Sequence, residues 1–169
     1  MNGMKGVVSG KLESLKSLIP GLSGREGIGL DEVDGEFRLH LSEKVMRAMD
    51  RLEDIKKEFS EDGKVVILGP MAKSIGRLSS LGTLLKSDKY SHSAIDDKIG
   101  GHELDRLYSF DMTLLEEVDK LDLIVEEIAT SDGYDAKVRE EIKRLEQFLD
   151  EIEELLSKRS ELLKNQETQ

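Results

Sequence analysis

The fold is decided by residues 104–163, which read LDRLYSFDMTLLEEVDKLDLIVEEIATSDGYDAKVREEIKRLEQFLDEIEELLSKRSELL. Apolar residues return every three or four positions in both halves, and a short polar segment, residues 130–133, separates them. This spacing puts one apolar stripe along a helix, and a stripe this long must be buried against another helix. The pattern predicts an antiparallel hairpin with arms roughly 40 Å long at about 1.5 Å per residue. The stripe positions are Leu104, Leu107, Asp111, Leu114, Val118, Leu121, Val125 and Ile128, then Val138, Ile142, Leu145, Leu149, Ile152, Leu156, Arg159 and Leu163.

The composition indicates long helices with solvated faces. Charged residues make up 36% of the 169 residues and aromatic residues 4%, and only two prolines are present. This combination is typical of helical proteins and not of sheets. We expect an all-α, elongated bundle forming one domain, with an N-terminal helix and linker (1–30), packing helices and a loop (31–101), and the hairpin (102–169).

Three further helices are expected before the hairpin. Residues 3–19 form a short amphipathic pattern that Pro20 ends, followed by a glycine-rich loop to residue 30. Residues 31–45 also alternate like a strand, but a longer spacing by three and four favours a helix over 31–60. Residues 65–68 are strand-like without a partner strand, so they are expected to be a buried extended link or part of a helix. Helix or strand stays open for 31–45 and 64–69, and Pro70 suits the first turn of a helix over 70–86.

The negative charge is concentrated in the hairpin. The net charge is −11, and residues 102–169 carry 20 acidic and 9 basic side chains, whereas residues 1–101 carry 16 of each. Such a surface repels phosphate backbones, so we expect no nucleic-acid partner, and its simplest role is to keep the protein in solution. The sequence has no cysteine, no long apolar run and no signal-peptide pattern, which favours a cytoplasmic location.

The sequence offers no recognisable catalytic or metal-binding motif. None of the three histidines, His40, His92 and His102, lies four residues from another, and neither a Glu-x-x-His pair nor an EF-hand loop is present. We therefore expect no metal, no cofactor and no enzymatic activity.

Two polar residues interrupt the apolar stripes. An unpaired carboxylate would be costly at Asp111, and Arg159 lies about one layer away on the other arm. We predict that they meet across the hairpin or share a partner from a third helix, fixing the register. The alternative is that the stripe opens at this end and leaves Asp111 in water.

Two short motifs carry a resemblance to a known family. Ile19-Pro20-Gly21 and the run from Leu104 through Leu107, Tyr108, Phe110, Asp111, Leu114 and Leu115 to Glu116 resemble a family of small uncharacterised helical proteins of bacteria and archaea. The resemblance implies no activity. It implies that Tyr108, Phe110 and Asp111 form a fixed cluster beside the 87–101 loop, in a membrane-associated stress or scaffold setting.

Three functions are compatible with these features. The first is a non-enzymatic helical adaptor or scaffold that contacts a protein partner or itself; Phe148, Leu155 and Leu162 widen the stripe for a third helix, which is favoured, or for a dimer mate. The second is a peripheral membrane protein that uses residues 3–19. The third is a small-molecule or metal-binding bundle with a site near Tyr90, His92, His102, Tyr108 and Asp111, because long ordered loops such as 87–101 are often functional.

Overall fold

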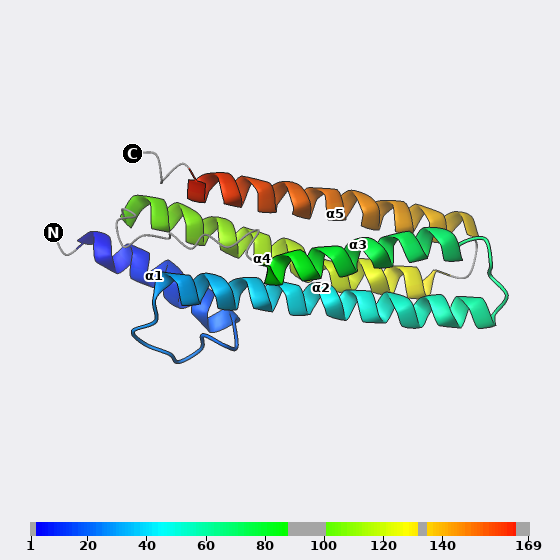
Figure 1. Ribbon diagram of the computed structural model, residues 1–169, viewed down its shortest axis with the longest axis horizontal. Helices are drawn as coiled ribbons and strands as arrows, with labels where there is room; N and C mark the ends of the chain where they lie inside the picture. The colour runs from blue at the N-terminus through cyan, green and yellow to red at the C-terminus, as the bar shows by residue number, and fades with distance from the viewer. Residues whose placement is uncertain (1–2, 88–100, 132–134, 165–169) are drawn as a thin grey trace.

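The protein is an all-α bundle, as predicted. The computed structural model describes residues 3–87, 101–131 and 135–164, with side chains from Gly10 onward. Within these ranges there is no strand, and the helices are α1 (Gly3–Leu18), α2 (Leu30–Glu61), α3 (Leu68–Lys86), α4 (Gly101–Thr130) and α5 (Asp135–Lys164). Figure 1 shows α2 to α5 side by side along the long axis of an elongated bundle, with α1 at the end where α2 begins.

The four longer helices pack as a ring. α2 contacts α3 and α4, and α5 contacts the same two helices, so α2 and α5 lie on one diagonal of the bundle. α4 and α5 run antiparallel, which confirms the predicted hairpin (Figure 1). α3 is the shortest of the four and covers the half of the bundle next to the α2–α3 turn, whereas α1 packs on α4 near the other end (Figure 1).

The predicted stripes form the core. Of the sixteen stripe positions only Leu104 is half-buried, and the others are buried. One apolar cluster takes side chains from all five helices. Phe148 is buried in this cluster and Leu155 packs against it, so these two side chains serve packing within the chain. Burial of about 25 cal/mol per Å² of apolar surface is the main force that holds such helices together.

Residues 31–45 are helical, because the spacing that places Phe37, Leu41 and Val45 in the core continues through α2. α2 ends at Glu61, and Gly63 just beyond it takes a left-handed φ of 78° that lets the Lys64 amide donate to the Phe59 carbonyl at 2.9 Å. This arrangement is a common helix stop in which glycine avoids the steric cost of positive φ.

The expectation of a buried extended link at residues 65–68 is wrong. Val65 and Val66 are 69% and 57% exposed in a turn, and only Ile67 is buried. Leu68 already belongs to α3, and Pro70 lies in the first turn of that helix. The described part of the chain contains no strand with which these strand-forming residues could pair, so the turn geometry decides their conformation.

α1 closes over the bundle. Its residues Leu12 and Leu15, together with Ile19 just after it, pack into the common core. Leu22, in the following loop, is also fully buried. Lys11 ties the helix to α4, since its Nζ lies 3.0 Å from Asp105 Oδ2 and donates to Ser109 Oγ at 2.7 Å.

Candidate functional site

A buried charge network crosses the bundle near the α1 end. Its first pair is Asp111 on α4 and Arg159 on α5, both 2% exposed. Arg159 donates from Nε to Asp111 Oδ1 at 2.6 Å and from Nη2 to Asp111 Oδ2 at 3.1 Å. The predicted contact across the hairpin is confirmed, and the alternative of a solvated Asp111 is wrong, because the stripe stays closed at this end.

A third helix also contributes an acid, which of the two residues contacts Arg159 alone and is not the shared partner that the prediction offered as an alternative. Asp34 on α2 is buried, and its Oδ1 lies 2.6 Å from Nη2 of Arg159. This contact is a close charge–charge approach and not an aligned hydrogen bond. Arg159 therefore lies between two carboxylates that come from two different helices.

Arg38 extends the network to the fourth helix. Its Nε donates to Asp34 Oδ2 at 2.9 Å, one helical turn away on α2. Its Nη1 donates to the carbonyls of Leu85 and Ser87, each at 3.0 Å. The last carbonyls of a helix lack partners within it and carry partial negative charge, so a guanidinium is a favourable cap. The network thus joins α4, α5, α2 and the end of α3.

Two aromatic side chains enclose these charges. The Phe37 ring lies 5.0 Å from the Arg159 guanidinium carbon, a cation–π distance. Burial raises the pKa of Tyr108 to about 12, with Asp111 acting in the same direction and Arg159 against it. The phenol therefore keeps its proton at neutral pH.

The protonation of Asp111 depends on its neighbour. Burial raises the pKa of this carboxyl above its ordinary value and Asp34 acts in the same direction, whereas the charge and hydrogen bonds of Arg159 offset only part of the rise. Burial also opposes the charge on Arg159, but Asp111 and then Asp34 outweigh it and raise the pKa of the guanidinium. Two acids and two arginines give a network without net charge, which is the state a low-dielectric interior tolerates.

The network leaves little room for a ligand. A crevice beside it has a volume of about 10 Å³, roughly enough for one water. Its lining residues are Leu30, Val33, Asp34, Leu104, Leu107, Tyr108, Asp111 and Arg159. The arrangement can fix the relative positions of four helices, and it offers a substrate-sized molecule no enclosed volume.

The predicted site residues are only partly brought together. Tyr108, Asp111 and Arg159 lie side by side around the crevice. His102 is exposed at the start of α4, and Tyr90 and His92 lie outside the described residues. Among the described side chains no group of three or more His, Asp or Glu residues is arranged to hold a metal.

Asp34 and Arg38 were missed by sequence reasoning. A signal was present, because they are an acid and a base four residues apart that directly follow the buried positions Val33 and Phe37. Such a pair next to an apolar stripe can equally be an exposed ion pair on a helix surface. The periodicity of α2 alone does not separate these cases.

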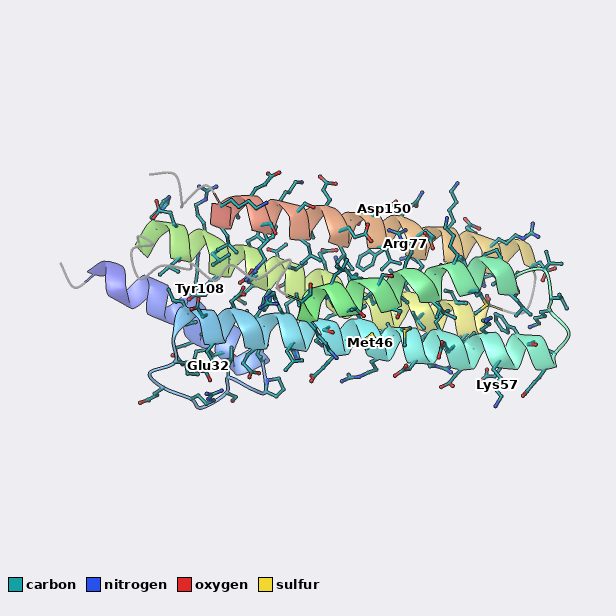
Figure 2. All side chains as sticks on the ribbon, viewed as in Figure 1. Glu32, Met46, Lys57, Arg77, Tyr108 and Asp150 are labelled. Atoms are coloured by element: carbon teal, nitrogen blue, oxygen red, sulfur yellow. The ribbon has the colours of Figure 1, made fainter. Side chains whose placement is uncertain are left out.

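A second polar contact joins α3 to α5 near the middle of the bundle. Arg77 donates to Glu146 Oε2 at 2.6 Å and to Asp150 Oδ1 at 2.7 Å, and Ser74 donates to Glu146 Oε1 at 2.7 Å. Figure 2 shows Arg77 on α3 beside Asp150 on α5. Burial would raise the pKa of Glu146, but the hydrogen bonds from Ser74 and Arg77 outweigh it and lower the pKa.

No family model, curated protein or solved structure matches this chain. None of the helices in the described part of the chain is long and apolar enough to cross a membrane. The function must therefore be inferred from the charges, contacts and surfaces of the bundle itself.

Proposed function

We propose that the protein is a non-enzymatic helical adaptor whose α4–α5 hairpin presents an acidic surface to a protein partner. The observation that supports this proposal is the exposure of most of the acidic excess. The exposed acidic residues of the two helices are Glu116, Asp119, Asp122, Glu126, Glu127, Asp135, Glu140, Asp150, Glu151, Glu153, Glu154 and Glu161.

The charge network supports the same proposal from inside the molecule. Asp111, Arg159, Asp34 and Arg38 bind one another and the end of α3, so their charges are used within the bundle. Contacts between all four helices keep their exposed faces in a fixed arrangement. A fixed surface loses less conformational entropy on binding than a mobile one.

The chemistry of the partner follows from the sign of the surface. A partner with clustered lysines and arginines would be steered towards the hairpin at long range, and the contact would weaken as salt is raised. The exposed acids are spread along both helices, so we expect the complementary surface to be elongated as well.

The test is cross-linking of the full chain in its own cells, followed by mass spectrometry of the linked peptides. We expect proteins with basic surfaces linked to hairpin lysines such as Lys137 and Lys143. A variant with Glu116→Gln, Asp122→Asn, Glu140→Gln and Glu154→Gln should lose these links. The matched control changes the same number of exposed acids on α2, by Glu43→Gln, Asp50→Asn, Glu53→Gln and Asp54→Asn. The proposal fails if the two variants lose the same links or if wild type gives none.

The membrane alternative has less support. Leu12, Leu15 and Ile19 in the 3–19 segment pack into the core, and Lys11 binds Asp105 and Ser109. Membrane binding by this segment would require these contacts to break. The metal-binding alternative lacks a described cluster to support it.

A further inference from the structure

We propose that a second copy of this chain docks in the groove between α4 and α5 on the outside of the hairpin. This inference rests on the proposed adaptor function and adds the protein itself as a partner. The groove has a volume of about 420 Å³ and is lined by Lys120, Leu123, Ile124, Glu127, Arg144, Gln147, Phe148 and Glu151.

The centre of the groove is apolar. Ile124 and Phe148 line the groove with side chains that are otherwise buried in the core, whereas Leu123 is 68% exposed on the same helix as Ile124. Leu123 is two residues from the stripe positions Leu121 and Val125, so it faces away from the hairpin contact. Covering a leucine this exposed, next to the apolar side chains of the groove, lowers the free energy of the complex and so favours binding of a partner.

The arrangement of charges around the groove indicates that the partner is a second copy of the chain. On α4, Lys120 precedes Leu123 and Glu127 follows it; on α5, Arg144 precedes Phe148 and Glu151 follows it. Because the helices are antiparallel, Lys120 and Glu151 lie towards one end of the groove, and Glu127 and Arg144 lie at the other. The ion pair between Arg144 and Glu127 confirms the second placement.

Four charges that alternate in sign are complementary to a copy of themselves. A two-fold axis in the plane of the groove and parallel to the helices places Lys120 opposite Glu151 of the second copy. An axis across the helices places Lys120 opposite Glu127 instead. In both arrangements Arg144 also meets an acid, so the groove satisfies the self-complementarity that a symmetric dimer requires.

The rest of the molecule opposes close approach. Two chains that each carry −11 repel at low ionic strength, so the dimer should form only where this repulsion is screened. At about 0.15 M salt the screening length is about 8 Å, which weakens the long-range repulsion more than contacts inside the groove.

The experiment is sedimentation equilibrium of the full chain at about 0.15 M salt over a wide concentration range. We expect a monomer–dimer equilibrium in wild type and a monomer for Leu123→Glu. Val65→Glu is the matched control, because Val65 is equally exposed, lies at the α2–α3 turn and gains the same charge. This control should dimerise like wild type.

Charge reversal tests the complementarity itself. Lys120→Glu should weaken the dimer by about fivefold, since it turns an attraction into a repulsion twice in a symmetric interface. The quadruple variant Lys120→Glu, Glu127→Lys, Arg144→Glu and Glu151→Lys inverts every sign and should return the dissociation constant to within about twofold of wild type.

Three outcomes would overturn the inference. They are a wild-type protein that stays monomeric, a Leu123→Glu variant that dimerises like Val65→Glu, and a quadruple variant no tighter than Lys120→Glu. If wild type is monomeric but still cross-links to basic proteins, only the dimer proposal is rejected. If wild type dimerises but gives no such links, only the proposal of a basic protein partner is rejected.

Discussion

Arg159 shows what a single residue contributes to this bundle. It reaches Asp111 on α4 and Asp34 on α2, and its guanidinium lies over the Phe37 ring. Buried ion pairs add little net stability compared with apolar side chains, but they penalise any packing in which the partners do not meet. Arg159 therefore selects one register of the hairpin and one position of α2 beside it.

Removing this arginine should be costly. In Arg159→Met the apolar packing is nearly conserved, but Asp111 and Asp34 stay buried without the cation between them. We expect the free energy of unfolding to fall by about 3–5 kcal/mol, measured by urea titration followed by circular dichroism. Arg144→Met, which removes an exposed arginine from the same helix, should cost less than about 1 kcal/mol.

A double variant separates loss of the pair from loss of packing. Asp111→Leu combined with Arg159→Met replaces both charges with apolar groups, so we expect it to recover at least about 2 kcal/mol relative to Arg159→Met alone. A double variant as unstable as the single one would mean that the penalty does not come from the unpaired charge of Asp111.

At the scale of elements, the contact between α2 and α3 depends on a glycine. The Ser42 hydroxyl donates to the Gly82 carbonyl at 2.7 Å, and a Cβ built on Gly82 would lie 2.6 Å from Met46 Sδ. Gly76 lies on the same helix, and a Cβ there would meet nothing within 4 Å. Gly82 is therefore buried against α2, whereas Gly76 is exposed.

This difference predicts different outcomes for the same substitution at the two positions. Gly76→Ala should stabilise the protein by about 1 kcal/mol, because alanine loses less conformational entropy in a helix. Gly82→Ala should lack this gain, since Met46 must move away, and we expect it to be at least about 1 kcal/mol less stable than Gly76→Ala. Thermal unfolding of the two variants measures the difference, and equal midpoints would contradict the close contact.

The contact between α3 and α5 should respond to acid. The lowered pKa of Glu146 means that its ionised form is favoured in the folded state over the unfolded state, where the value is near 4.5. The contribution of Glu146 to the free energy of unfolding is therefore complete above about pH 4.5. It is lost as the pH falls through the lower pKa that Glu146 has in the folded protein. Urea midpoints measured against pH should show this loss, and Glu146→Gln should flatten the profile there. A profile identical to wild type would remove Glu146 from the contact.

At the scale of the whole molecule, the packing of α1 against the other helices makes the N-terminal segment part of the bundle. Leu15 is fully buried in the common core, whereas Leu18, three residues later, is half exposed. A helix that used its leucines on a membrane surface would keep both of them out of the core. The contrast between buried Leu15 and exposed Leu18 therefore indicates a helix that is packed on the bundle and not one that is free to bind a membrane.

Alanine substitutions test this placement. We expect Leu15→Ala to lower the free energy of unfolding by about 2–5 kcal/mol, because it leaves a cavity in the core. Leu18→Ala on the same helix should change it by about 0.5 kcal/mol or less. Two small effects would show that α1 is not docked, and binding of both variants to anionic liposomes should then be measured.

The sequence by itself determined the helices and which of their faces are buried. The spacing of Leu, Ile and Val predicts α2, α4 and α5 and their core faces, and the polar exceptions Asp111 and Arg159 predict their own pairing. These features are local, because a helix repeats every 3.6 residues and an isolated buried charge is costly wherever it occurs. The strand-like run at residues 65–68 misleads because its neighbours in space, not its composition, set its conformation.

Only the tertiary structure decided how α2 and α3 lie against the α4–α5 hairpin. The addition of Asp34 and Arg38 to the network requires α2 to lie against Arg159 and α3 to end beside Arg38. The alternating charges around Leu123 likewise need α4 and α5 in one particular register. Periodicity specifies a face on each helix but not the rotation and lateral order that bring two faces together, and those follow from packing the whole core at once.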